Sequence, residues 1–199
     1  MREHHPHPNL GRLLSPRQYS RAHDSYAAGL PVAADNDCFQ GLDVQRFKSM
    51  CYALEFLPVH WVSVPDVVAD AKATMPRFAR WRDFVASLGH SVALCAQDGL
   101  RSVPWDEIDC LFIGGSTEWK MSDQAHALVR EARERGKWTH MGRVNTARRM
   151  MLAGSWGIDS VDGTSTSMFR RLRLPQRLAQ AAAPRQFSLV LAGQEGKPE

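Results

Sequence analysis

The chain has 199 residues, of which 44% are hydrophobic and 23% charged, as is usual for one globular domain. The formal net charge of +4 permits nucleic acid as a partner without requiring it. No apolar stretch approaches the roughly 20 residues that span a bilayer, and the N-terminus has no apolar signal core, so we expect no membrane association and a cytoplasmic location.

Short apolar runs alternate with amphipathic segments along the chain. Such runs, bounded by turn residues, predict buried parallel strands, and the segments between them predict helices. The expected strands are 10–15, 31–35, 61–66, 92–97, 110–115, 138–144, 158–163 and 187–193. The expected helices are 16–28, 43–57, 69–88, 122–135 and 145–155, with Asp43, Ser122 and Asn145 as N-caps, and a basic, Pro-interrupted helix after 163.

This alternation closes most simply into an α/β fold of the TIM-like (β/α)8 barrel type. The connection between 97 and 110 has room for only a turn or two, so the helix ring is expected to be incomplete. We expect a polar N-terminal tail (1–9), one barrel domain (10–194) and a C-terminal tail (195–199). The four cysteines form no CxxC or CxC pair and are expected to be buried hydrophobes, so no zinc subdomain, other metal or cofactor is predicted.

Acids, an amide and glycines follow the predicted strands, where a barrel would collect them at one mouth. Asp162 sits in GIDSVDGTS, with little bulk around it, and can act as a nucleophile at an anomeric carbon or simply cap a helix or close a loop. Asp35 and Phe39 lie in ADNDCFQ, which predicts either a general acid/base beside a stacking ring or a turn.

The remaining residues at the strand ends suit a purine. Asp66 in VPDVV needs a partner for a buried carboxylate, and Gln97 can donate and accept at a lactam edge. Gly114 and Gly115 allow a close backbone approach, although glycines are commonplace at strand ends. Met141 offers a second stacking face opposite Phe39, or is simply core, and together these residues predict a purine pocket with Asp162 attacking the sugar.

The ordered motifs resemble the tRNA-guanine transglycosylase superfamily over about residues 30–165. ADNDCFQ resembles the family's SDSGGFQ, and SVPD resembles the strand that carries its base-reading aspartate. CAQDG is similar to VQGG, FIGGSTEWK to IGGLAVGE, THMGRVN to LMGVGTP, and GIDSVDGTS to GIDMFDCVLPT. The resemblance implies that Asp162 is the nucleophile and Asp35 the acid/base, and that Phe39, Asp66, Gln97, Gly114, Gly115 and Met141 bind the base.

This combination of motifs is most similar to that of short, phage-encoded members of the superfamily, which are linked to the insertion of 7-deazaguanines into DNA. It implies a ping-pong exchange of guanine for a preQ0-like base, without a cofactor, in the host cytoplasm if the protein is phage-encoded. Extruding a guanine from a duplex usually needs contacts on both sides, which makes a homodimer, an accessory protein or single-stranded substrate compatible with this interpretation.

Two departures from the family pattern affect the choice of substrate. Asp37 and Cys38 replace the family's GG, which puts the loop geometry in question. No Cys or His follows His140, so the family's CxCxxC…H zinc motif is missing and DNA is favoured over tRNA. Four arginines after the nucleophile strand could contact phosphates or form a solvated helix face: Arg170, Arg171, Arg173 and Arg177.

Other interpretations stay open from the sequence. One is an RNA or tRNA guanine transglycosylase, and another is a non-catalytic protein that binds a deazapurine or nucleic acid. A metal-dependent barrel hydrolase is disfavoured because only His140 lies at a strand end. The sequence assigns no role to four residues at the expected pocket rim: Glu118, His140, Arg143 and Asn145.

Overall fold

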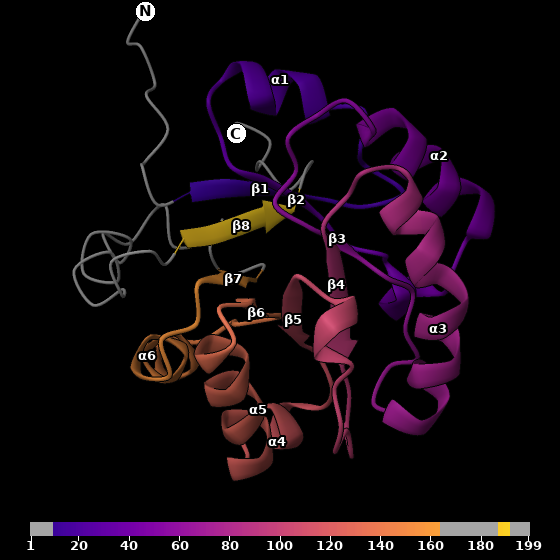
Figure 1. Cartoon of the computed structure of the whole chain (residues 1–199). Coiled ribbons are helices and arrows are strands. Elements are labelled where there is room, and N and C mark those ends of the chain that lie inside the picture. Colours follow the sequence, from indigo (N-terminus) through magenta and orange to yellow (C-terminus); the bar gives the residue numbers. More distant parts are fainter. Residues whose placement is uncertain (1–9, 164–186, 192–199) are drawn as a thin grey trace, which may run out of the picture.

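The computed structural model describes residues 10–163 and 187–191, which contain eight parallel strands. The strands are β1 (Leu10–Leu14), β2 (Val32–Ala34), β3 (Val62–Ser63), β4 (Val92–Ala96), β5 (Cys110–Ile113), β6 (Trp138–Met141), β7 (Ser160–Asp162) and β8 (Phe187–Leu191). They pair in sequence order, and β8 lies between β7 and β1, which closes the barrel (Figure 1). The predicted α/β barrel of the TIM-like kind is therefore confirmed at the level of its strands.

Helices follow most of the strands and cover the outside of the barrel (Figure 1). They are α1 (Ala22–Ala27), α2 (Val44–Leu54), α3 (Ala71–Ser87), α4 (Thr117–Lys120), α5 (Asp123–Glu134) and α6 (Ala147–Ser155). The connection from β4 to β5 holds only a short 3-10 helix, Trp105–Glu107, as its length predicted. The predicted basic helix and its arginines, as well as both predicted tails, lie outside the described residues.

The helix starts agree with the sequence at two caps and differ at two. The side chain of Asp43 accepts the backbone N–H of Arg46, and that of Ser122 caps α5, as expected. The helix expected from about 69 begins at Ala71, and the Asp70 side chain caps it. The prediction that Asn145 caps α6 is wrong, because the N-cap is Thr146, whose hydroxyl accepts the backbone N–H of Arg149.

Strand residues alternate between two separate cores with the period of two that a strand imposes. The barrel interior is filled by Leu13, Ala33, Trp61, Ala93, Cys95, Cys110 and Phe112. The larger core lies between the strands and the helices, and it takes the neighbouring strand positions, such as Leu14, Ala34 and Ile113. Because of this alternation, every second side chain of a strand points into the barrel. The last inward-facing side chain of each strand lies at the mouth.

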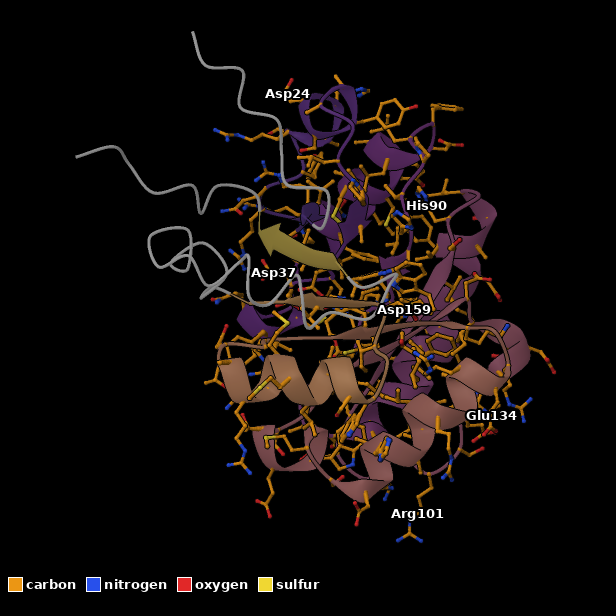
Figure 2. All side chains as sticks on the ribbon, turned by 90° about the vertical axis from the view of Figure 1, so that its left-hand side faces the viewer. Asp24, Asp37, His90, Arg101, Glu134 and Asp159 are labelled. Carbon is orange, nitrogen blue, oxygen red and sulfur yellow. The ribbon has the colours of Figure 1, made fainter. Side chains whose placement is uncertain are left out.

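The two ends of the barrel are distinct in Figure 2. Asp37, which follows β2, lies at the end toward which the arrow of β8 points. His90 and Asp159, which precede β4 and β7, lie toward the other end. The carboxyl ends of the strands, and the polar residues that follow them, therefore share one mouth.

Two further properties follow from the described residues. None of their helices has both the length and the apolar composition to span a bilayer. All four cysteines are free thiols, and three of them are buried as expected, whereas Cys38 is only partly covered. Within these residues, no three His, Cys, Asp or Glu side chains come together in a way that could hold a metal ion.

Candidate active site

Asp162 ends β7 and is held by hydrogen bonds to both of its carboxylate oxygens. Its Oδ1 accepts the backbone N–H of Arg143 at 3.0 Å, and its Oδ2 lies 3.0 Å from Nε2 of His140. The Asp162 side chain is almost completely buried in the barrel mouth. Two donors on one carboxylate favour a fixed orientation of its plane, which a nucleophile requires.

His140 is one of the four residues to which the sequence assigned no role, and it lies inside the barrel in contact with Asp162. Its ring is fully buried and packs against both Trp61 and Phe112, with ring centroids 4.8 and 4.5 Å away, and these two rings also contact each other at 5.6 Å. Its Nδ1 lies 2.8 Å from the Ser160 hydroxyl. The signal for this placement was available in the strand period, because His140 alternates with two outward residues of β6.

Asp35 follows β2 at the same mouth, and its chemistry differs from that of Asp162. Burial and the negative charges of Asp162 and Asp66 raise the pKa of Asp35 to about 8. Asp35 therefore keeps its proton at neutral pH, as a general acid does. The structure thus brings together the two aspartates to which the sequence assigned catalysis, although they come from β2 and β7.

Asp66 and Gln97 are also at the mouth, where they bind each other. The amide of Gln97 donates to Oδ2 of Asp66, and the amide of Asn36 donates to Oδ1 at 2.8 Å. Burial raises the pKa of Asp66. Asn36 was missed as a functional residue, and it also donates to the Val64 carbonyl, which joins the loop after β2 to β3. The partner that a buried Asp66 needed is therefore provided by two amides of the protein.

Gly114 and Gly115 make room for this amide network. The Gly115 N–H donates to Oε1 of Gln97 at 2.8 Å, while the Gly114 N–H donates to the Ala96 carbonyl. A Cβ on Gly114 would lie 2.7 Å from Nε2 of Gln97, and Gly115 has a φ of +70°. Both glycines are thus explained by close approach and backbone conformation, and in this state their N–H groups already have acceptors.

The two residues predicted to stack on a base, Phe39 and Met141, lie in different surroundings. Phe39 is exposed at 63%, and the guanidinium of Arg143 lies 4.7 Å from the centre of its ring. Met141, by contrast, is fully buried in the core between strands and helices. The prediction that the Met141 side chain covers the second face of a base is therefore wrong, because the strand period turns it away from the mouth.

The loop after β6 is fixed by contacts that sequence reasoning did not find. Lys120 is fully buried, and its Nζ donates to the Gly142 carbonyl at 2.8 Å. Burial and the positive charge of Arg143 lower the pKa of Lys120 to about 8. Arg143 has a φ of 55°, a left-handed conformation, and its side chain donates to the Gly115 carbonyl. These contacts orient the N–H that holds Asp162.

Three other residues named from the sequence are placed as follows. Asp37 has a φ of 58°, so it adopts the left-handed conformation that a glycine at this position would favour, and it pairs with Arg17 at 2.7 Å. Glu118 is exposed on α4, and Asn145 is half-buried beside Gly163. Four arginines lie outside the described residues: Arg170, Arg171, Arg173 and Arg177.

Comparison with known proteins identifies no family, so the assignment of a function depends on the site itself. No protein-family model matches the chain, and no curated protein matches its sequence.

Proposed function

We propose that this protein is a base-exchange transglycosylase that replaces guanine in DNA with a 7-deazaguanine such as preQ0. The observation that carries the proposal is the pairing of Asp35 with Asp162 at one barrel mouth. Their opposed roles need one protonated and one charged carboxyl, and the charge of Asp162 is one cause of the pKa of about 8 at Asp35. The sequence resemblance supplies the identity of the base.

The proposed reaction has two displacements at C1′ of the nucleotide. A carboxylate oxygen of Asp162 forms a bond to C1′ while the bond from C1′ to guanine breaks, and Asp35 gives its proton to the leaving base. The incoming 7-deazaguanine then loses a proton to Asp35 and forms its bond to C1′, which releases Asp162. Two inversions restore the original configuration at the sugar.

Base recognition in this proposal uses the amide network. Asp66 would accept the N–H groups of the purine edge once the amides of Asn36 and Gln97 move aside, since both of its oxygens carry those amides in this state. Phe39, which is exposed, would stack on one face of the base. The second face would be covered by a residue other than Met141.

A cationic groove beside the mouth supports a nucleic-acid substrate. The groove, of about 490 Å3, lies between α2 and α3 and is lined by Leu42, Val44, Lys48, Pro76, Arg77, Arg80 and Trp81. Its Arg77 donates to the backbone carbonyl of Asp66 at 2.6 Å, which connects the lining of the groove to a residue proposed to bind the base. Three cations and no carboxylate among its lining residues suit a phosphodiester backbone.

Exchange of radiolabelled guanine into nucleic acid tests the function. Purified protein would be incubated with duplex DNA, single-stranded DNA and tRNA, with preQ0 as competing base and Asp162→Ala and Asp162→Asn as controls. We expect incorporation into DNA, competition by preQ0 and loss of incorporation in both variants. Lys48→Ala with Arg80→Ala is expected to raise the KM for DNA several-fold with kcat unchanged.

The other outcomes point to different functions. Incorporation into tRNA alone would replace DNA by RNA as the substrate. Binding of preQ0 without exchange on any nucleic acid would contradict an enzyme acting alone and favour an accessory base-binding protein.

A further inference from the structure

A continuous chain of hydrogen bonds runs through the barrel interior from Trp138 to Asp162. Nε1 of Trp138 lies 3.0 Å from the Ser160 hydroxyl oxygen, and that oxygen lies 2.8 Å from Nδ1 of His140. Nε2 of His140 lies 3.0 Å from Oδ2 of Asp162. This chain of hydrogen bonds joins β6 to β7, which are paired strands.

Trp138 and Asp162 stand at the two ends of this chain, and their chemistry determines which group donates in each hydrogen bond between them. An indole N–H can only donate, and an ionised carboxylate can only accept. Trp138 therefore donates to Ser160, and Nε2–H of His140 donates to Asp162. The Ser160 hydroxyl is left to donate to Nδ1, so Ser160 and His140 each donate one hydrogen bond and accept one.

Only one form of His140 satisfies all three contacts and also gives the Ser160 proton an acceptor among them. The Nδ1–H tautomer would place the lone pair of Nε2 against the Asp162 carboxylate. In the doubly protonated form the Ser160 oxygen would accept two N–H groups, which its two lone pairs allow, but the Ser160 proton would have no acceptor among these contacts. The neutral Nε2–H tautomer leaves no such conflict.

Packing then fixes the ring in the plane that these bonds require. His140 is fully buried, and the rings of Trp61 and Phe112 lie against it at centroid distances of 4.8 and 4.5 Å. Rotation of the imidazole would have to displace one of these two rings. The donor at Nε2 is thus presented to Asp162 in a preset orientation.

We infer that His140 is a positioning residue for Asp162, set in the Nε2–H tautomer by Ser160 and Trp138. Together with the N–H of Arg143, it fixes the plane of the carboxylate that attacks the sugar. The catalytic consequence rests on the proposed function, whereas the tautomer does not.

Nitrogen NMR of the histidines tests the tautomer independently of any activity. In protein labelled with 15N at the imidazoles, the His140 signals are assigned by their loss in His140→Gln. At neutral pH we expect Nε2 to be protonated and Nδ1 unprotonated, with the Nδ1 resonance moving in Ser160→Ala as its hydrogen bond is lost. A protonated Nδ1 in the wild-type protein would overturn the inference.

Kinetics of base exchange test the positioning role. His140→Phe keeps a ring against Trp61 and Phe112 but removes the donor, and we expect kcat to fall about 100-fold with the KM for the base unchanged. His140→Gln places an amide N–H near the position of Nε2 and should recover much of that loss. Trp138→Phe removes the N–H that orients the Ser160 hydroxyl but leaves the bond from Ser160 to Nδ1, so we expect kcat to fall by less than in His140→Phe.

Failure of the positioning role and failure of the proposed function give different results. Wild-type kcat in a folded His140→Phe protein, or a His140→Gln protein no faster than His140→Phe, would contradict the positioning role. Absence of exchange in the wild-type protein would remove the proposed function, and the NMR result would still decide the tautomer.

Discussion

Asp35 and Asp162 are the same residue type at the same mouth, and their surroundings divide the chemistry between them. Asp162 receives one N–H from the backbone of Arg143 and one from His140, which suits a carboxylate anion. Asp35 faces negative charge and little solvent, and its pKa of about 8 reflects both. The protonation state of Asp35 therefore depends on the charge of Asp162.

Removing the charge of Asp162 should lower the pKa of Asp35. In Asp162→Asn the second largest cause of the raised value is lost, so we expect the pKa to fall below about 8 while burial keeps it above 3.8. Carbon NMR of labelled aspartate carboxyls, titrated in both proteins, measures this shift. An unchanged pKa of Asp35 would show that the two carboxyls are not coupled and would remove the basis for their division of roles.

Much of the site at this scale could be predicted from the residues themselves. Asp35, Asp66, Gln97 and Asp162 were expected at the mouth because each follows a short apolar run, and all four lie there. Their hydrogen-bond partners could not be predicted, because the bonds of Gln97 to Asp66 and of His140 to Asp162 join strands whose register the sequence does not state.

At the scale of strands and loops, the period of two decides which residue of β6 reaches the site. His140 faces inward and Met141 faces the helices, so the residue chosen from the sequence for stacking belongs to the outer core. The motif THMGRVN shows both residues but not which face each one takes. Likewise, Asn145 does not cap α6, because Thr146 provides a hydroxyl acceptor one position later.

Gly142 tests how closely the β6 loop must approach Asp162. A Cβ there would lie 2.6 Å from Cε2 of Phe112 and 3.3 Å from Oδ2 of Asp162. Gly142→Ala should therefore lower the free energy of unfolding by about 1–3 kcal/mol and reduce exchange, because the clash displaces the loop that holds the nucleophile. Urea unfolding and the exchange rate, measured on the same preparation, check both effects.

Gly136→Ala is the matched control for this variant. Gly136 has a φ of +67° with nothing within 4 Å of an added Cβ, so the cost is backbone strain of about 1–2 kcal/mol. We expect a comparable loss of stability with unchanged exchange. Equal exchange in both variants would contradict the claim that the Gly142 loop positions Asp162.

At the scale of the whole molecule, the barrel gathers residues from distant parts of the chain at one mouth. The alternation of strands and helices was sufficient to predict this architecture, including the short connection after β4. The raised pKa of Asp35 could not be predicted in the same way, because it sums charges contributed by the ends of β2, β3 and β7. The candidate site therefore depends on the closure of the barrel as well as on the residues of its motifs.

Detection of a covalent sugar–protein intermediate is the most direct test of the account. Protein incubated with a guanine-containing DNA oligonucleotide would be quenched in denaturant, digested and analysed by mass spectrometry. We predict that the peptide containing Asp162 carries the oligonucleotide that has lost guanine, and that Asp162→Asn gives no adduct. Base exchange that proceeds with this peptide unmodified, or an adduct on another residue, would contradict the assignment of Asp162 as the nucleophile.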